Sequence, residues 1–164
     1  MDLISRLRSI WPVAALLGSG ALLAGAHAFQ RLGGLAPCPL CLQQREWHWA
    51  VVGVALIALA LRFTPLNRPR LAASVLGVVL LGAAGMAFYH VGVEQGWFVA
   101  TCEANFDLGD IQAFDPNATL VAPTCTTPAW TMFGISMAGY NAIISFLLAL
   151  ASFLVAFMPE QRNG

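Results

Sequence analysis

Four long apolar segments dominate this chain and restrict it to folds that suit a lipid bilayer. They cover roughly residues 11–29, 42–63, 71–89 and 130–158. A membrane-spanning helix needs about 20 mainly apolar residues, with a range of roughly 17–25. Only 10% of the residues are charged, whereas a soluble domain carries about 25%, so the chain cannot cover a water-facing surface. We therefore predict an all-α membrane protein, a single domain over residues 1–164 built as a four-transmembrane-helix bundle.

Prolines mark the breaks between these segments. They stand between the second and third segments and before the fourth, at Pro65, Pro69, Pro123 and Pro128. The second segment is marginal as a membrane span, because polar residues 43–46 occupy its first turn. The remaining connections are longer and cover about residues 30–41 and 90–129.

The arginines are distributed unequally between the two faces of the predicted bundle. Six of the eight basic residues lie before segment one, between segments two and three, or after segment four: Arg6, Arg8, Arg62, Arg68, Arg70 and Arg162. Basic residues near membrane spans remain on the cytoplasmic side. We therefore expect both termini to be cytoplasmic and the two longer connections to be outer loops. The formal net charge of zero gives no indication of a nucleic-acid partner.

All four cysteines fall on the predicted outer face, where disulfides persist. Cys38 and Cys41 form a C-x-x-C pair in the first outer loop and at its edge, and Cys102 and Cys125 lie in the second outer loop. A C-x-x-C pair is typical of a redox dithiol or of half a metal site.

Three interpretations of these cysteines compete. Structural disulfides are reasonable for Cys102 and Cys125, where closing the loop would stabilise the fold by about 3.5 kcal/mol, but a bridge within the C-x-x-C pair closes almost no loop. Zinc accepts four thiolates, yet the second pair lacks the C-x-x-C spacing, and a c-type haem is disfavoured because Leu42 stands where that motif needs His. A disulfide relay, with no metal, is the favoured interpretation.

Arg45 follows Cys41 by four residues and would lie on the same helix face. Thiol exchange requires thiolates with lowered pKa values. A cysteine at a helix N-terminus gains roughly 0.3–1 kcal/mol from the helix dipole, and Arg45 could stabilise the Cys41 thiolate or a reduced acceptor. The alternative is an interfacial arginine whose charged end reaches water.

Other residues have structural interpretations. His27 and His48 lie near the outer ends of the first two segments, where we interpret them as interfacial anchors. Gly77, Gly82 and Gly85 predict close packing of the third segment against its neighbours.

The chain resembles the DsbB family of bacterial disulfide bond formation proteins over nearly its whole length. The residues that carry the resemblance are Cys38-Pro39-Leu40-Cys41-Leu42-Gln43-Gln44-Arg45, Tyr89-His90, Thr101-Cys102-Glu103, Cys125, Trp130, Phe133-Gly134-Ile135-Ser136-Met137 and Asn141. Ala138 departs from the pattern, because many members have Pro after the Met. The constellation of four cysteines together with Arg45 is highly specific, and the pattern at the fourth helix is moderately specific.

This resemblance implies an enzyme of the bacterial inner membrane, a quinone-dependent thiol oxidase. Such an enzyme re-oxidises a soluble, thioredoxin-like DsbA-type protein in the periplasm and passes two electrons to ubiquinone or menaquinone. Carried over by position, Arg45 lies beside the quinone head group, and His90 is a further neighbour of the quinone.

The resemblance also assigns the four cysteines. Cys102 forms the mixed disulfide with the partner protein, and Cys125 is the cysteine that is disulfide-bonded to Cys102. Cys125 then engages Cys38, and Cys41 is released as a thiolate beside the quinone. Spacing alone leaves open all three pairings that four cysteines allow.

Two further functions remain open at this point. A quinone reductase of the vitamin-K-epoxide-reductase type would run related chemistry in the opposite direction with a helix-bundle C-x-x-C pair. A membrane scaffold stapled by disulfides would have no catalytic role.

Overall fold

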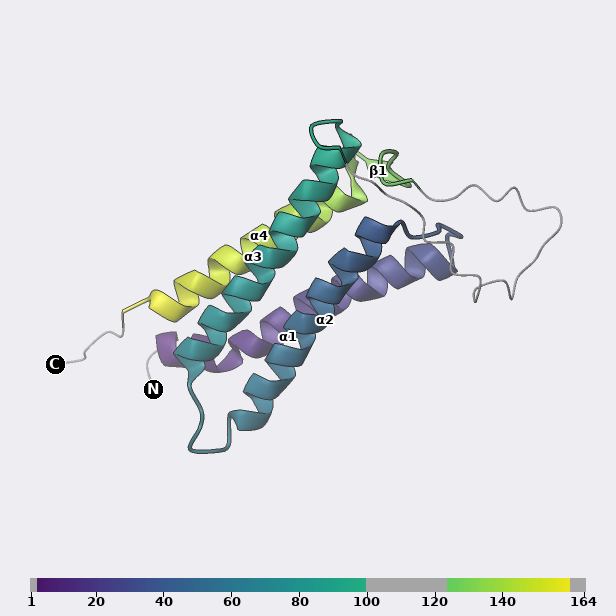
Figure 1. Ribbon diagram of the computed structural model, residues 1–164. Helices are drawn as coiled ribbons and strands as arrows, with labels where there is room; N and C mark the ends of the chain where they lie inside the picture. Colours follow the sequence, from purple (N-terminus) through teal and green to yellow (C-terminus); the bar gives the residue numbers. More distant parts are fainter. Residues whose placement is uncertain (1–2, 100–123, 160–164) are drawn as a thin grey trace.

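The computed structural model describes residues 3–99 and 124–159, which form four long helices and one short hairpin (Figure 1). The helices are α1 (Leu3–Arg31), α2 (Pro39–Leu61), α3 (Pro69–Glu94) and α4 (Met137–Phe157). The strands β1 (Thr131–Met132) and β2 (Ile135–Ser136) precede α4. The described part of the chain is therefore mainly helical, as its apolar segments predict.

Three of the described helices are long and apolar enough to cross a membrane, namely α1 over Ile4–Arg31, α3 and α4. α2 is not among them, because polar residues 43–46 lie near its start. Large apolar side chains point away from the bundle, such as Leu17 at 67% exposed and Val78 at 62%. Such a surface suits lipid rather than water, and the described part of the chain is that of a helical membrane protein.

Successive helices run in alternating directions, so that four helix ends meet at one end of the bundle (Figure 1). The last residues of α1 and α3 and the first residues of α2 and α4 lie there, together with the hairpin. We call this the cysteine end, because Cys38, Cys41 and Cys125 lie in these segments or next to them. α3 packs most extensively on α4, and α2 lies against both α1 and α3.

Small side chains allow the helices to approach one another closely. One buried cluster consists of Ala15, Val51, Ala55, Leu76, Leu80 and Ala149. A Cβ added at Gly77 would meet the Phe153 ring of α4, and one at Gly82 would meet the Trp47 ring of α2. The predicted close packing is therefore confirmed at these two glycines. It is wrong at Gly85, where an added Cβ would have no described neighbour within 4 Å.

The hairpin before α4 explains why that helix begins later than the apolar segment suggests. We expected a helix from residue 130, whereas α4 begins at Met137. Phe133 and Gly134 have φ angles of 51° and 77°, and they connect two antiparallel strands. Positive φ at both central residues is typical of the two-residue hairpin turn. Ser136 then caps α4, since its Oγ accepts a hydrogen bond from the Gly139 N–H at 3.1 Å.

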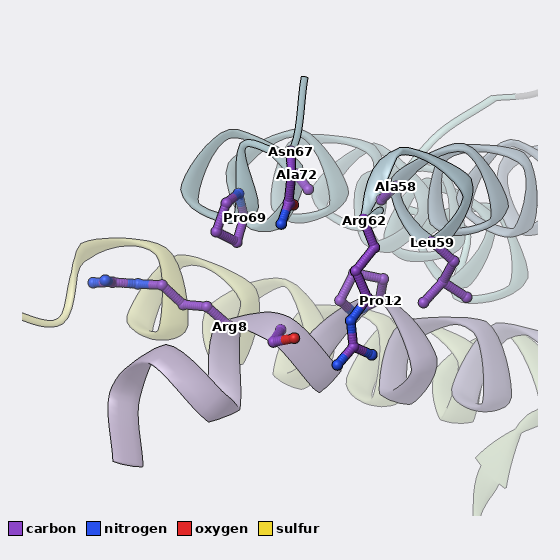
Figure 2. A pocket seen from close by; sticks show the side chains of 9 residues that line it. Arg8, Pro12, Ala58, Leu59, Arg62, Asn67, Pro69 and Ala72 are labelled. Carbon is purple, nitrogen blue, oxygen red and sulfur yellow. The ribbon is translucent and has the colours of Figure 1, made fainter. Parts of the chain in front are cut away.

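A small pocket lies at the opposite end of the bundle, between α1, α2 and α3 (Figure 2). Arg8 in its wall is buried, and its guanidinium donates hydrogen bonds to the carbonyl oxygens of Val155, at 3.0 Å, and Met158. Carbonyls at the end of a helix have no partner within the helix. The Nε1–H of Trp11 also donates to Ser152 Oγ at 2.9 Å. Together these bonds fasten α1 to α4.

Candidate redox site

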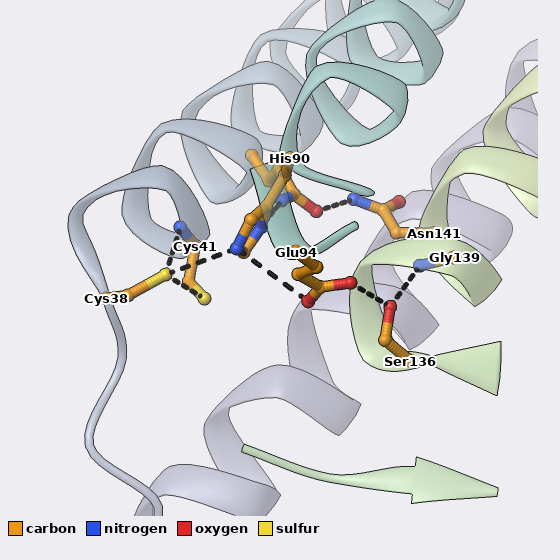
Figure 3. A network of polar contacts seen from close by, with 8 residues as sticks. Cys38, Cys41, His90, Glu94, Ser136, Gly139 and Asn141 are labelled. Atoms are coloured by element: carbon orange, nitrogen blue, oxygen red, sulfur yellow. Dashed lines mark hydrogen bonds and ion pairs between the residues drawn. The ribbon is translucent and has the colours of Figure 1, made fainter. Parts of the chain in front are cut away.

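The C-x-x-C cysteines lie at the start of α2 (Figure 3). Cys38 is the N-cap residue, and its Sγ accepts a hydrogen bond from the Cys41 backbone N–H at 3.2 Å. Pro39 occupies the first helical position, where its missing N–H leaves nothing unsatisfied. Both thiols are free, and their Sγ atoms are 2.6 Å apart. A disulfide bond measures about 2.05 Å, so a small movement closes this pair.

The hydrogen bond between the two thiols makes their acidities unequal. It is the main cause that raises the pKa of Cys38 above the ordinary value of 9.0, and burial is the second cause. The same bond lowers the pKa of Cys41 to about 7, while burial opposes this shift and the charge of Arg45 supports it. Cys41 lies in the first turn of α2, ahead of the apolar stretch. It is therefore the sulfur that ionises near neutral pH.

Cys125 approaches the same pair of sulfurs from a distant part of the chain. It is 1% exposed, disulfide-bonded, and packed in an apolar cluster with Cys38, Leu40 and Val93. The Sγ atoms of Cys38 and Cys125 and a ring nitrogen of His90 all lie within 4.8 Å of one another. The structure thus brings three of the predicted cysteines together; Cys102 lies outside the described residues.

His90 lies near the end of α3 and faces the cysteines (Figure 3). Its Nε2 is 3.7 Å from Cys38 Sγ and 3.8 Å from Glu94 Oε1. Its Nδ1 is 2.6 Å from the Gln44 amide nitrogen. Because an amide NH₂ only donates hydrogen bonds, Nδ1 is the acceptor, and the neutral ring carries its proton on Nε2. This N–H is directed at the cysteine site.

A network of hydrogen-bonded polar side chains, buried or half-buried, continues inward from Gln44. The Asn141 amide donates to Gln44 Oε1 at 2.6 Å (Figure 3). Asn141 Oδ1 in turn accepts hydrogen bonds from His48 Nε2 at 2.8 Å and from Ser145 Oγ at 3.0 Å. Buried polar groups require such partners, because an unpaired one loses its hydration without compensation. These hydrogen bonds hold the Gln44 side chain in one position next to the His90 ring.

His48 is part of this network, and its interpretation as an interfacial anchor is wrong. The ring is 3% exposed, and its Nδ1 lies 3.2 Å from Ser19 Oγ on α1. Sequence reasoning also missed Gln44 and Asn141 as site residues. A usable signal was present on α2, since Cys41, Gln44 and His48 follow the i, i+3, i+7 spacing of one helix face.

Arg45 reaches across to α1 from the same end of α2. Its Nη1 donates to Gln30 Oε1 at 2.5 Å, and its Nη2 donates to the Ala26 carbonyl oxygen at 3.2 Å. These bonds hold a half-buried guanidinium near Cys41 instead of leaving it free to reach water.

A cavity of about 690 Å³ opens beside Cys41. All four helices contribute to its walls, and most of its lining is apolar, including Phe29 of α1 and Ile144 of α4. Cys41, Gln44 and Arg45 supply polar groups from α2. Small-molecule sites are typically of about 300–1,000 Å³, mainly apolar, with few polar groups that orient the ligand. The residues present therefore fit a molecule with a polar head and an apolar remainder.

Comparisons with known proteins agree with this arrangement. The family model described as "Disulfide bond formation protein DsbB" matches residues 8–155. The chain is 36% identical over 153 residues to "Disulfide bond formation protein B" of Methylococcus capsulatus, which covers 87% of this chain and 89% of the relative. Proteins of the same name from Aromatoleum aromaticum and Polaromonas naphthalenivorans are 30% and 31% identical; they cover 92% and 99% of this chain and 95% and 99% of the relatives.

No solved structure was found to match the chain. The family model nevertheless covers most of it, and the relatives are similar over nearly their whole length. Cysteines gathered at one end of a membrane helix bundle suit disulfide chemistry. The chain therefore belongs to the DsbB family of disulfide bond formation proteins.

Proposed function

We propose that the protein is a membrane thiol oxidase that re-oxidises a soluble DsbA-type dithiol protein and passes two electrons to ubiquinone or menaquinone. One observation carries the proposal. Cys38 Sγ lies 2.6 Å from Cys41 Sγ and within 4.8 Å of Cys125 Sγ. A sulfur in that position can exchange partners with either neighbour, because exchange needs a thiolate to reach a disulfide sulfur.

Electrons enter by thiol–disulfide exchange. A thiolate of the partner attacks Cys102 in a Cys102–Cys125 disulfide, so that a mixed disulfide forms and Cys125 leaves as a thiolate. Cys125 then attacks Cys38 in a Cys38–Cys41 disulfide, and Cys41 leaves as a thiolate. The second thiolate of the partner attacks the partner's own sulfur in the mixed disulfide. This step releases the oxidised partner and the Cys102 thiolate.

Cys102 finally attacks Cys125 and releases Cys38. The partner has then lost two electrons and two protons, and Cys38 and Cys41 hold them as a dithiol. Two features of the site favour these steps. The lowered pKa of Cys41 makes it a good leaving group, and the Nε2–H of His90 faces Cys38, where it can stabilise the departing thiolate.

A quinone would supply the acceptor of two electrons and two protons that returns Cys38 and Cys41 to a disulfide. The cavity supports this assignment because Cys41 and His90 line it. The guanidinium of Arg45 is held in place by α1 and would offer positive charge to a quinone head group in the cavity. The apolar walls suit a lipid-soluble molecule.

We place this enzyme in the bacterial inner membrane, with both termini in the cytoplasm and the cysteine end in the periplasm. The arginine distribution supports that orientation. We also propose that α2 crosses the membrane as the fourth span. Gln44 and His48 are buried against the other helices, and the exposed polar residues Gln43 and Glu46 lie near the start of α2 at the cysteine end, so the exposed side chains over the rest of the helix are apolar.

The test is to replace Cys41 with Ser and to measure reduction of quinone by the reduced partner. We expect turnover to fall to background, while the variant still forms the mixed disulfide with the partner. Undiminished turnover of the Cys41→Ser variant would contradict the proposed mechanism. Absence of any covalent complex in the unsubstituted protein would favour the stapled scaffold. Faster reaction from quinol to oxidised partner than in the forward direction would favour the reductase.

A further inference from the structure

Three buried side chains at the cysteine end form a donor set of a kind that binds metal. They are Cys38, Cys125 and His90, and one donor atom of each lies within 4.8 Å of the others. Zn²⁺ prefers thiolate and imidazole ligands in tetrahedral geometry, with Zn–S about 2.3 Å and Zn–N about 2.0–2.1 Å. Neighbouring ligand atoms of such an ion lie roughly 3.5–3.8 Å apart. The 3.7 Å from Cys38 Sγ to His90 Nε2 already matches this spacing.

We propose that the reduced protein binds one Zn²⁺ ion between Cys38, Cys125 and His90. Cys125 is disulfide-bonded in the structure, so the site forms only after that bond is reduced. A phosphine reductant and one water molecule convert the disulfide into two thiols and the phosphine oxide. Zn²⁺ then displaces one proton from each of Cys38 and Cys125, and the two thiolates neutralise its charge.

This donor set differs from four cysteines around one ion. Cys41 lies outside the set among the described residues, although its sulfur is 2.6 Å from Cys38 Sγ. A histidine from α3 takes part instead. The site therefore joins three distant parts of the chain, and the C-x-x-C pair contributes one ligand to it.

The polar network beneath His90 can support a metal on Nε2. A neutral histidine that binds metal through Nε2 carries its proton on Nδ1 and donates it to a second group. If the side-chain amide of Gln44 flips by about 180°, its oxygen accepts that hydrogen bond from His90 Nδ1–H and its nitrogen donates toward Asn141. Asn141 can turn in the same way, so that its nitrogen donates to His48 Nε2 and the His48 proton moves to Nδ1, facing Ser19.

Every side chain of this hydrogen-bonded network thus keeps a partner in the metal-bound state, without movement of the backbone. The surroundings of the ion are also favourable. Glu94 Oε1 lies 3.8 Å from His90 Nε2 and adds negative charge, and its other oxygen accepts a hydrogen bond from Ser136. Cys38 and His90 line the cavity, so water can reach the fourth coordination position.

Occupation of this site would inhibit the protein reversibly. Zn²⁺ would hold the two sulfurs, Cys38 and Cys125, that must meet during the proposed exchange. Reduced protein would be held in an inactive form until a chelator removed the ion.

The experiment uses the full-length protein in detergent, reduced with a phosphine under anaerobic conditions, without quinone or partner. Zinc chloride is titrated against a chromophoric chelator, and Co²⁺ replaces Zn²⁺ to report thiolate ligation by its absorption. We expect one equivalent of metal and two protons released. Cys125→Ser and His90→Ala should each weaken binding by more than about 100-fold, and Gln44→Met by about 10–100-fold, as expected for a residue that orients a ligand.

Cys41→Ser and His27→Ala are the matched controls, and both should retain affinity because neither residue belongs to the donor set. Unchanged affinity in Cys125→Ser, or loss of binding in Cys41→Ser, would show that the C-x-x-C pair alone holds the ion and would overturn the proposal. Equal binding by oxidised protein would overturn it as well. Because no quinone or partner is present, the result is independent of the turnover test.

Discussion

At the scale of single residues, two cysteines three positions apart have different acidities. Cys38 stands at the helix N-cap and hydrogen-bonds through its sulfur to the other thiol, which raises its own pKa. The same bond lowers the pKa of Cys41, and the charge of Arg45 lowers it to a smaller extent. The difference follows from position, since the two side chains are chemically identical.

The pH dependence of Cys41 alkylation tests this difference. Only a thiolate is alkylated, so the rate for the reduced protein should rise with pH through a midpoint of about 7, below the ordinary value of 9.0. Iodoacetamide labelling followed by mass spectrometry measures the rate. In Cys38→Ala the main stabilising bond is absent, and the midpoint should move up toward the ordinary value; an unmoved midpoint would contradict the assigned cause.

Arg45 should affect both the thiolate and the acceptor. In Arg45→Met the midpoint of Cys41 alkylation should rise less than in Cys38→Ala, because the charge is a smaller cause of the pKa shift. The apparent KM for quinone should increase about tenfold, as expected for loss of about 1.4 kcal/mol of binding, with a smaller effect on kcat. Arg45→Lys retains the charge and is the matched control. Equal KM values in all three proteins would remove Arg45 from the quinone site.

At the scale of elements, caps and turns determine where the sulfurs lie. Pro39 begins α2 directly after Cys38, and the hairpin that ends at Ser136 sets the start of α4. We expected the second helix from residue 42, whereas α2 begins at Pro39, one turn earlier, because a proline at the first helical position and a cap residue start the helix locally. The sequence indicates the start of the fourth helix poorly, because Trp130, Met132, Phe133 and Ile135 extend the apolar segment although Phe133 and Gly134 turn the chain.

Two glycines of α3 provide a paired test of helix packing. Gly82→Ala should destabilise the bundle by about 1–3 kcal/mol, the range for overpacking, because the new Cβ would lie 2.4 Å from the Trp47 ring. Gly85→Ala meets no described neighbour and should be neutral or stabilising by up to about 1 kcal/mol, since alanine favours helix. The midpoints of thermal unfolding of the two variants, measured in the same detergent, test this difference. Equal midpoints would contradict a close contact between α2 and α3 at Gly82.

At the scale of the whole molecule, alternating helix directions gather the reactive residues at one end. α3 carries His90 to the first cysteine pair, and α4 carries Asn141 to Gln44. The opposite end is fastened separately by Arg8. The cysteine pair and the contacts of Arg8 therefore lie at different ends of the same helices.

The proposed membrane topology can be tested with single cysteines. In a chain whose native cysteines are replaced by serine, Thr64→Cys places a thiol in the exposed connection between α2 and α3, and Leu32→Cys places one after α1. We expect an impermeant maleimide to label Leu32→Cys in spheroplasts and Thr64→Cys only in inverted vesicles. Labelling of both from the periplasmic side would show that α2 does not cross the membrane.

The amino-acid sequence is enough to predict that this protein lies in a membrane, that it is helical, and which segments carry its reactive residues. Composition and apolar length depend only on the residues present, and the C-x-x-C pair with Arg45 depends on spacing within one turn. The cysteine motif also indicated the family, which the relatives confirm.

The contacts between side chains from different helices become visible only in the folded structure. Gln44 bonds to His90 46 positions away and to Asn141 97 positions away. Arg45 finds its partners on α1, and Cys125 lies against Cys38 and His90. Periodicity in a sequence specifies the face of a helix on which a residue lies. It does not specify the neighbouring helix that the face will contact, because that choice depends on how all four helices pack together.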